Sequence, residues 1–159
     1  MQTDFEQPHI RAATAADMDA VAAIEAKITG EAKPAYWRDT FQRFGRRDDR
    51  YFLLAEDSAK RVLGYIVGEV RAWEFGSPPC GWIFAIGVDP DLRVRKIGSR
   101  LFAAVSTRMR AAGVDTVRTM IARDDELIMA FFRSQGMMAG PFVQLEMPVD
   151  GGWDDGGAS

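Results

Sequence analysis

Hydrophobic and polar positions in the first third of the chain follow a helical period, which predicts two helices after a short extended start at His9–Ala12. Apolar residues recur at helical spacing over Met18–Ile28, and Gly30 marks the end of that helix. Pro34 begins a second helix, in which aromatic residues mark one face before Gly45 ends it. The mixed charges after Gly45 indicate a solvent-exposed turn.

The middle of the chain changes to strand-like runs of apolar residues. Tyr51–Glu56 and Arg61–Trp73 are two such runs joined by a short polar turn, which predicts an antiparallel hairpin. A loop that contains two prolines follows. The next run, Trp82–Val88, is almost wholly apolar, which is typical of a central strand buried on both faces.

The last third of the chain alternates between helices and strands. Its pattern predicts a helix over Ile97–Ala112, a strand over Asp115–Ala122, a helix over Asp125–Gln135 and a last strand over Pro141–Val149. Strands joined through helices pair in parallel, whereas the hairpin before them is antiparallel. The expected fold class is therefore α/β, a mixed sheet with an antiparallel first half and a parallel central pair, flanked by helices.

Length and charge indicate one globular domain. The chain has 159 residues, of which 47% are hydrophobic and 27% are charged. We expect a single domain over residues 1–150 and a flexible tail at 151–159, where glycine and aspartate predominate. The net charge of −3 disfavours a nucleic-acid partner, because binding to phosphates depends on clustered lysine and arginine.

Rare residue types and the absence of targeting patterns limit the kinds of site and the cellular locations that we expect for this protein. A single cysteine, Cys80, excludes an internal disulfide framework, and a single histidine, His9, excludes a histidine-rich metal site. The start of the chain has no secretory-signal pattern, and no apolar stretch reaches about 18 residues. We therefore expect a cytoplasmic protein with no metal and no membrane partner.

The stretch "VDPDLRVRKIGSRLF", Val88–Phe102, has the layout of an anion site, with a strand, a short loop and then a helix. The first turn of a helix leaves backbone N–H groups unpaired and carries about half a positive charge. Gly98 and Ser99 keep the surface small there, and cations surround it at Arg93, Arg95, Lys96 and Arg100. The alternative is a charged turn without a ligand, but cations at a helix N-terminus are unfavourable unless an anion lies among them.

This stretch resembles the acyl-CoA-binding motif of the GNAT superfamily of N-acyltransferases, which runs Gln/Arg-x-x-Gly-x-Gly/Ala after a strand ending in Val-x-Pro. "DELIMAFFRSQGM", which begins at Asp125, resembles the family's later Asn-x-x-Ala-x-x-Phe-Tyr motif, and the order of elements agrees over most of the chain. The resemblance implies a GNAT-like fold, acetyl-CoA as the acyl donor, and transfer of the acetyl group to an amine by direct attack.

The resemblance also implies which residues bind the cofactor. In the family, the pantetheine arm bonds to the stretch that matches Ile86, Gly87 and Val88, and the later motif contributes Asp125 and Phe132. Arg93 takes the first motif position, and backbone amides hold the pyrophosphate over Val94, Arg95, Lys96, Ile97, Gly98 and Ser99.

Three positions depart from the family pattern. Lys96 stands where the motif has its first glycine, which fits if the backbone there is already helical. Asp125 replaces asparagine and so lacks an amide donor. Phe132 replaces the tyrosine that often protonates the leaving thiolate, so this general acid is absent.

Direct attack requires a polarised carbonyl and a route for the proton. The backbone N–H of Val88 is the expected oxyanion donor. Glu69, an acid inside an otherwise apolar strand, is the candidate base, because burial there would raise its pKa. In the alternative, Glu69 faces solvent or pairs with an arginine such as Arg71.

Aromatic and acidic residues are candidates for the acceptor side. Glu74 lies between Trp73 and Phe75, and an acid among aromatic rings suits an ammonium group. Tyr36 and Trp37 belong to a helix that tends to cover the acceptor in such folds. Plain core packing is the competing interpretation of these aromatic residues.

Several functions stay open at this point. The acceptor is either a small-molecule amine or an amine of a protein, and fold analogy does not choose between them. A non-catalytic acyl-CoA sensor or partner-binding module is the alternative to an enzyme, and a nucleotide-binding domain that uses the same turn is a third reading. The apolar stretch at 142–149 is compatible with a homodimer.

Overall fold

A computed structural model describes residues 7–45, 47–72 and 74–150, and within them five strands form one sheet in the order β1-β2-β3-β4-β5. The strands are β1 (His9–Ala12), β2 (Arg50–Glu56), β3 (Val62–Arg71), β4 (Cys80–Val88) and β5 (Val117–Thr119). The helices are α1 (Met18–Thr29), α2 (Pro34–Phe44), α3 (Ile97–Ala111) and α4 (Glu126–Ser134), with 3-10 turns η1 (Ala15–Asp17), η2 (Glu74–Gly76) and η3 (Pro90–Arg95). Pairing is antiparallel from β1 to β4 and parallel between β4 and β5, which confirms the predicted fold class.

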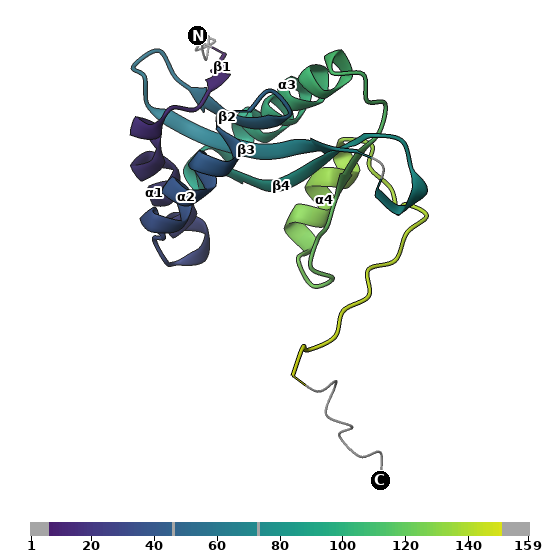
Figure 1. Ribbon diagram of the computed structural model, residues 1–159. Coiled ribbons are helices and arrows are strands. Elements are labelled where there is room, and N and C mark those ends of the chain that lie inside the picture. Colours follow the sequence, from purple (N-terminus) through teal and green to yellow (C-terminus); the bar gives the residue numbers. More distant parts are fainter. Residues whose placement is uncertain (1–6, 46, 73, 151–159) are drawn as a thin grey trace.

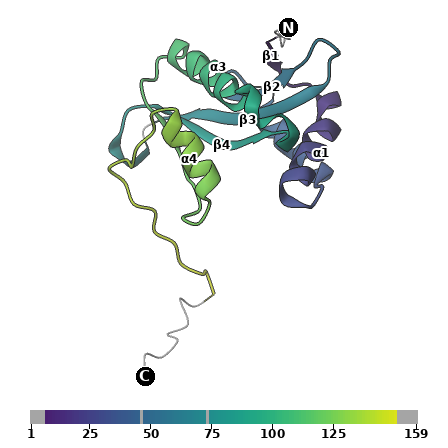
Figure 2. The same cartoon turned by 180° about the vertical axis from the view of Figure 1, so that it is seen from behind.

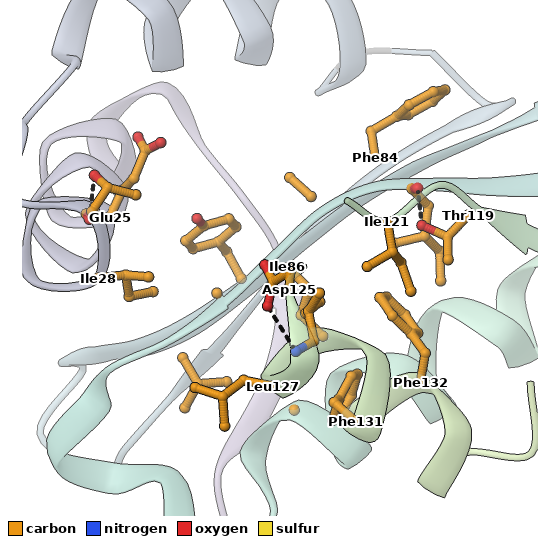
Figure 3. A pocket seen from close by; sticks show the side chains of 18 of the residues that line it. Glu25, Ile28, Phe84, Ile86, Thr119, Ile121, Asp125, Leu127, Phe131 and Phe132 are labelled. Carbon is orange, nitrogen blue, oxygen red and sulfur yellow. Dashed lines mark hydrogen bonds between the residues drawn. The ribbon is translucent and has the colours of Figure 1, made fainter. Parts of the chain in front are cut away.

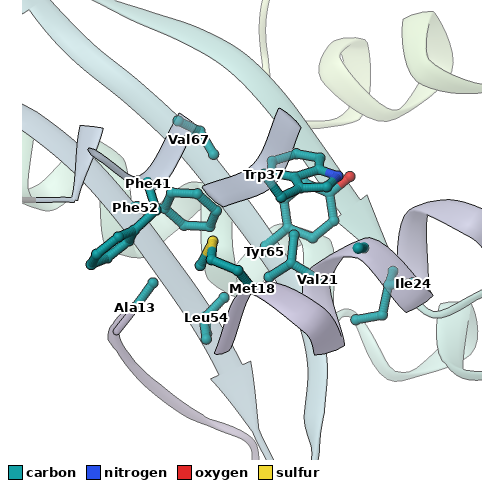
Figure 4. Packing of buried hydrophobic residues seen from close by; sticks show 11 residues of the cluster. Ala13, Met18, Val21, Ile24, Trp37, Phe41, Phe52, Leu54, Tyr65 and Val67 are labelled. Atoms are coloured by element: carbon teal, nitrogen blue, oxygen red, sulfur yellow. The ribbon is translucent and has the colours of Figure 1, made fainter. Parts of the chain in front are cut away.

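The sheet lies between two layers of helices (Figure 1 and, from behind, Figure 2). On one face, α1 and α2 enclose a core in which Trp37 and Phe41 pack with Phe52 and Leu54 (Figure 4). The alternate β2 residue Leu53 belongs to the core on the opposite face, beneath α3 and α4, as the two-residue period of a strand requires. Among the described residues, no helix combines the length and the apolarity needed to cross a membrane.

An ion cluster joins β1 to the start of α1. Arg11 donates to Asp17 from both terminal nitrogens at 2.8 Å, and its Nε donates to Glu56 at 2.7 Å. The backbone N–H of Thr14 donates to the same Asp17 carboxylate at 2.7 Å. The hydrogen bonds from Arg11 lower the pKa of Asp17 from 3.8 to about 2, against the opposing effect of burial.

β4 and β5 separate after three paired residues. Pairing ends at Ile83 and Thr119, where the Thr119 hydroxyl donates a hydrogen bond of 2.9 Å to the Ile83 carbonyl. The next residue, Phe84, has no partner on β3, because Ile83 and Ala85 pair with consecutive β3 residues. A bulge of this kind bends its strand, so β4 turns away from β5 at the point where their pairing ends.

The expectation that Trp82–Val88 is buried on both faces is wrong. Phe84 is 43% exposed, and Ala85 and Ile86 are half-buried. The physical reason is the separation of the two strands, since β5 covers β4 only as far as Ile83.

Residues 141–149 form no strand, which corrects the predicted last strand. Phe142 contacts the body of the molecule, with its ring 5.7 Å from that of Phe75 and the Arg118 guanidinium 4.7 Å above it. Beyond it the segment leaves the body as the yellow trace of Figure 1 and exposes its apolar residues Val143, Leu145, Met147 and Val149. An alternating pattern forms a strand only beside another strand, and none pairs with it here. The predicted flexible tail, 151–159, lies outside the described residues.

Candidate functional site

A cleft of about 890 Å³ lies where β4 leaves β5. β4 and the chain after β5 form its sides, and it extends from the start of α3 and from α4 to α1 and α2. Figure 3 shows Asp125 and Phe132 of α4 on one side of β4, and Glu25 of α1 on the other. Residues singled out from the sequence that line this cleft are Tyr36, Trp37, Ile86, Gly87, Val88, Lys96, Gly98, Ser99, Asp125 and Phe132.

Beyond Ile83, the edge of β4 that faces the cleft pairs with no other strand in the described part of the chain. On its opposite edge β4 pairs with β3 as far as Val88, and the N–H of Asp89 donates to the Leu63 carbonyl at 2.9 Å. Successive residues of a strand direct their N–H and C=O groups to opposite edges. Since the N–H of Asp89 faces β3, the N–H groups of Val88 and Ile86 face the cleft. The predicted oxyanion donor, the N–H of Val88, is one of them.

Lys96 joins η3 to α3 through a left-handed backbone, with φ of 54° and ψ of 29°. The condition under which a non-glycine residue fits here, a helical backbone, is not met, because a right-handed helix requires negative φ. Glycine adopts this conformation freely, whereas a residue with a Cβ is strained by about 1–2 kcal/mol. The exposed Lys96 side chain lines the cleft, so its ammonium lies at the end formed by α3.

The first turn of α3 packs closely against α4. A Cβ on Gly98 would lie 3.0 Å from Cε2 of Phe131, so a side chain there would crowd α4. The Ser99 hydroxyl accepts a 2.9 Å hydrogen bond from Nε2 of Gln135, and Ile97 is fully buried. The turn therefore presents mainly backbone to the cleft, including N–H groups that have no acceptor within the helix.

The loop before α3 is held to α1. The Asp89 carboxylate accepts a hydrogen bond from the N–H of Asp91 at 3.1 Å and another from Nζ of Lys27 at 2.8 Å. The Lys27 ammonium lowers the pKa of Asp89, and Asp89 in turn raises the pKa of Lys27. The backbone at the end of η3 belongs to Arg93, Val94 and Arg95, whose side chains lie outside the described part of the chain.

α4 brings both of its predicted cofactor residues to the cleft. Oδ1 of Asp125 accepts the N–H of Ile128 at 3.1 Å and so caps the helix. Phe132 is 3% exposed and packs edge-on against Phe102 and Phe131. Asp125 is therefore engaged with its own helix, and Phe132 presents a ring without a hydroxyl.

Glu69 does not line the cleft and is held in two ion pairs. Its carboxylate lies 2.8 Å from Nε of Arg71 and 3.2 Å from Nε of Arg50. Each of its two carboxylate oxygens thus has an arginine partner, Oε1 with Arg71 and Oε2 with Arg50. This geometry matches the alternative of pairing with an arginine and does not support Glu69 as the base.

Of the residues predicted for the acceptor side, Tyr36 and Trp37 line the cleft. Glu74 lies outside it, with one carboxylate oxygen 3.6 Å from the Arg71 guanidinium. Trp73 lies outside the described residues. Trp37 is 2% exposed, whereas Tyr36 beside it is 53% exposed, so the α2 wall has one buried and one accessible ring.

Two further lining residues were missed from the sequence. Glu25 lies on a half-buried face of α1, and its carboxylate accepts a hydrogen bond from Nε1 of Trp37. Tyr65 of β3 is buried, and both its burial and the charge of Glu25 raise the pKa of its phenol. No motif includes either residue. In the sequence, Glu25 has the pattern of an ordinary acid on a helix, and Tyr65 has that of an aromatic core residue.

The sequence resembles a family profile and curated proteins. The profile of the acetyltransferase (GNAT) family matches residues 18–137, well over half of the chain. A mycothiol acetyltransferase of Kocuria rhizophila is 34% identical over 91 residues, which are 56% of this chain and 30% of that protein. The chain thus spans less than a third of the length of this relative.

Solved structures share the fold. An aminoglycoside antibiotic 6'-N-acetyltransferase from Acinetobacter baumannii superposes with a TM-score of 0.74 at 14% identity, covering 89% of this chain and 99% of that one. An aminoglycoside acetyltransferase from an uncultured soil metagenomic sample, in complex with sisomicin, has a TM-score of 0.70 at 17% identity and covers 89% and 95%. Identities this low show a common architecture.

Proposed function

Because the chain belongs to the acetyltransferase (GNAT) family, we propose that it transfers the acetyl group of acetyl-CoA to a primary amine by direct attack. The observation that carries this proposal is the unpaired edge of β4, which leads through η3 to the first turn of α3. An extended donor lying along this edge brings its reactive end to the cleft and its phosphates to the start of the helix.

The residues present fit an acyl-CoA donor at three points. Ile86 and Val88 offer N–H groups to an arm that adds to β4 like a further strand. Lys96 and the first N–H groups of α3 offer positive charge to a pyrophosphate. Gly98 lets the first turn of α3 lie close to Phe131 of α4 and adds no side chain of its own to the cleft. When bound, acetyl-CoA supplies an activated thioester carbonyl.

The chain's own contribution to the chemistry is positioning and charge stabilisation. The N–H of Val88 donates to the carbonyl oxygen as negative charge develops on it, and a donor of this kind changes the rate by about 10²–10³-fold. Phe132 provides no proton for the leaving sulfur. A thiol with a pKa of about 8.5 leaves without that help.

A small-molecule amine is the acceptor class that we favour. The relatives above are a mycothiol acetyltransferase and aminoglycoside acetyltransferases, one of them in complex with sisomicin. The exposed Tyr36 ring at the α2 end of the cleft suits a compact ligand. An amine of a protein is the competing class.

Binding is tested by thermal unfolding with CoA, acetyl-CoA, ATP and NAD in separate samples. A ligand at one hundred times its dissociation constant stabilises the fold by about 2.7 kcal/mol, and we expect that response from the two CoA species alone. Gly98→Glu places bulk and negative charge in the first turn of α3 and should abolish it. Gly140→Glu, at a position with no atom within 4 Å of its added Cβ, is the control and should respond like wild type. A response to ATP or NAD instead of CoA contradicts the proposal.

Turnover is tested by release of free CoA thiol with sisomicin, spermidine, 2-phenylethylamine and a lysine-containing peptide with a free amino terminus. Acetylation of any of the first three supports a small-molecule acceptor, and acetylation of the peptide alone supports the competing class. Binding of acetyl-CoA without turnover on any amine favours a non-catalytic acyl-CoA-binding module. Phe132 is the observation that favours this second function, because it replaces the tyrosine that often protonates the leaving thiolate in the family.

A further inference from the structure

We propose that Glu25 is the group that binds the acceptor's ammonium and takes its proton, an inference that rests on the proposed amine acetylation. It makes Glu25 a catalytic residue and places the acceptor between α1, α2 and β4. It also defines the substrate class, an amine that is positively charged when it binds.

Glu25 is the carboxylate in the cleft that is free for this task. Within the described residues, the cleft is lined by two acids, Glu25 and Asp125. Asp125 caps α4 through the N–H of Ile128. Glu25 comes from the opposite wall, and Figure 3 shows its carboxylate on the α1 side of β4, across from α4.

The surroundings of Glu25 leave its negative charge without a cation. One oxygen accepts the indole N–H of Trp37, which fixes the carboxylate against α2. No lysine or arginine in the described part of the chain forms an ion pair with it at 4.0 Å or less. A half-buried carboxylate in this position is stabilised by a cation from outside, and an ammonium group is one.

Aromatic rings complete the cation-binding surface around Glu25. The ring of Trp37 lies 5.2 Å from that of Tyr36 and 4.8 Å from that of Tyr65, centroid to centroid, and all three residues line the cleft. Figure 4 shows the Trp37 and Tyr65 rings together above the sheet. Ring faces attract cations, and because Trp37 and Tyr65 are buried, it is the exposed Tyr36 ring that adds to the attraction of the carboxylate for an ammonium.

Tyr65 connects this surface to the reacting edge of β4. A Cβ on Gly87 would lie 2.6 Å from the Tyr65 hydroxyl, so that hydroxyl lies directly over Gly87. Gly87 stands between Ile86 and Val88, whose N–H groups face the cleft. Burial and the Glu25 charge keep the phenol protonated at neutral pH, so Tyr65 remains a hydrogen-bond donor beside the place of attack.

The proton balance of the step is complete with these groups. The ammonium gives one proton to the Glu25 carboxylate, and the neutral nitrogen then forms a bond to the acetyl carbon. The carbon–sulfur bond breaks, its electron pair goes to sulfur, and the second proton passes from nitrogen to that sulfur. Glu25 finally releases its proton to water, so the products are the amide, CoA thiol and one proton.

The test compares Glu25→Gln, Glu25→Asp and the control Glu31→Gln, with the amine that the wild type acetylates fastest in the panel above. Glutamine retains an oxygen for the Trp37 N–H but has no charge. We expect kcat/KM for the amine to fall by about 10²–10⁴-fold in Glu25→Gln, with the dissociation constant of acetyl-CoA within twofold of wild type. Glu25→Asp should recover part of the rate. Glu31 is exposed in the loop after α1, so its variant should match wild type.

A second measurement separates chemistry from folding. The wild-type plot of log kcat/KM against pH should fall at acid pH, and Glu25→Gln should lack that limb. Other titratable groups that line the cleft are Lys33, Tyr36, Tyr65, Lys96 and Asp125, and they are unchanged in the variant. A retained acid limb, or a loss of less than tenfold in kcat/KM, overturns the assignment while the proposed function stands. Failure of the wild type on every amine overturns the proposed function itself.

Discussion

Lys96 has a strained backbone and lies at the end of the cleft where the phosphates of the donor are proposed to bind. Its left-handed φ would suit glycine, yet the chain places there a side chain whose ammonium lines the cleft. A lysine at this position costs stability, and a gain in binding a phosphate is the physical reason to retain it.

Lys96→Gly should therefore stabilise the fold and weaken donor binding. Relief of strain of about 1–2 kcal/mol, offset by the greater freedom of glycine in the unfolded chain, predicts a net gain of about 0.5–1 kcal/mol. Acetyl-CoA affinity should fall severalfold because a cation is lost beside the pyrophosphate. Chemical denaturation and titration calorimetry measure the two effects.

Lys60→Gly is the matched control for this prediction. Lys60 also has positive φ, at 65°, but it lies in the turn between β2 and β3. Its variant should gain less stability, because Lys60 also pairs with the buried Glu56 carboxylate at 3.3 Å, and should leave the acetyl-CoA affinity unchanged. Equal loss of affinity in both variants would show that the Lys96 charge is not involved.

Asp17 gives the fold a defined response to acid. Its pKa of about 2 in the folded state lies below the ordinary 3.8, so its contribution is complete above about pH 4 and disappears as the pH falls through 2. Asp17→Asn should lower the free energy of unfolding by about 1–2 kcal/mol at pH 7, because charge-assisted hydrogen bonds to Arg11 are lost. Urea denaturation at several pH values should show this difference shrinking between pH 4 and pH 2. A difference that is constant with pH would contradict the assignment.

At the cleft, the sequence pointed to backbone positions on β4 and α3 and to side chains on α2 and α4, but not to Glu25 or Tyr65. The resemblance through Val88 and Gly98 identified an edge and a turn whose geometry follows from the motif. Glu25 is one of several acids on a helix, and only tertiary packing against Trp37 distinguishes it from the others. For Glu69, the sequence offered pairing with Arg71 as the alternative to a base, and the pairing of β2 with β3 adds Arg50 as a second partner.

At the scale of elements, side chains as well as backbone pairing join β4 to β5 up to the point where the two strands separate. The Thr119 hydroxyl holds the last paired residues together at the apex of the cleft. Thr119→Val preserves shape and removes this bond, so it should destabilise the fold by about 1 kcal/mol and speed amide hydrogen exchange in β5. Thr116→Val is the control and should have little effect, because the exposed Thr116 hydroxyl donates to the neighbouring Asp115.

Helices were easier to predict than strands for a physical reason. A helix satisfies its own backbone, so the apolar period and the bounding residues Gly30 and Pro34 sufficed for α1 and α2. A strand needs a neighbour. The regular alternation at 142–149 therefore predicted a strand that the structure does not form, and the short β5 ends as soon as β4 bends away.

At the scale of the whole molecule, the segment 143–149 is a large apolar surface attached to a sheet with a free edge at β5. Val143, Leu145, Met147 and Val149 are 80%, 90%, 71% and 101% exposed. Burying such side chains yields about 1.5–3 kcal/mol each. We expect the segment to add as a strand to β5 of a second copy, which would make the protein a dimer in solution.

Light scattering coupled to size exclusion measures this association. Replacement of Val143, Leu145 and Met147 together by serine should give a monomer. The double variant Gln144→Ser and Glu146→Ser, on the alternate face, should remain a dimer. A wild type that is monomeric at every concentration, or a triple variant that still dimerises, would contradict this prediction.

The unpaired edge of β4 has a consequence for how the protein can diverge. Main-chain N–H groups are common to every residue type except proline, so recognition by that edge tolerates drift in the side chains of Ile86 and Val88. The surface around Glu25 is built entirely of side chains on other elements. Substitutions in α1 and α2 can therefore change the acceptor, while the edge of β4 and the first turn of α3 continue to bind the same donor.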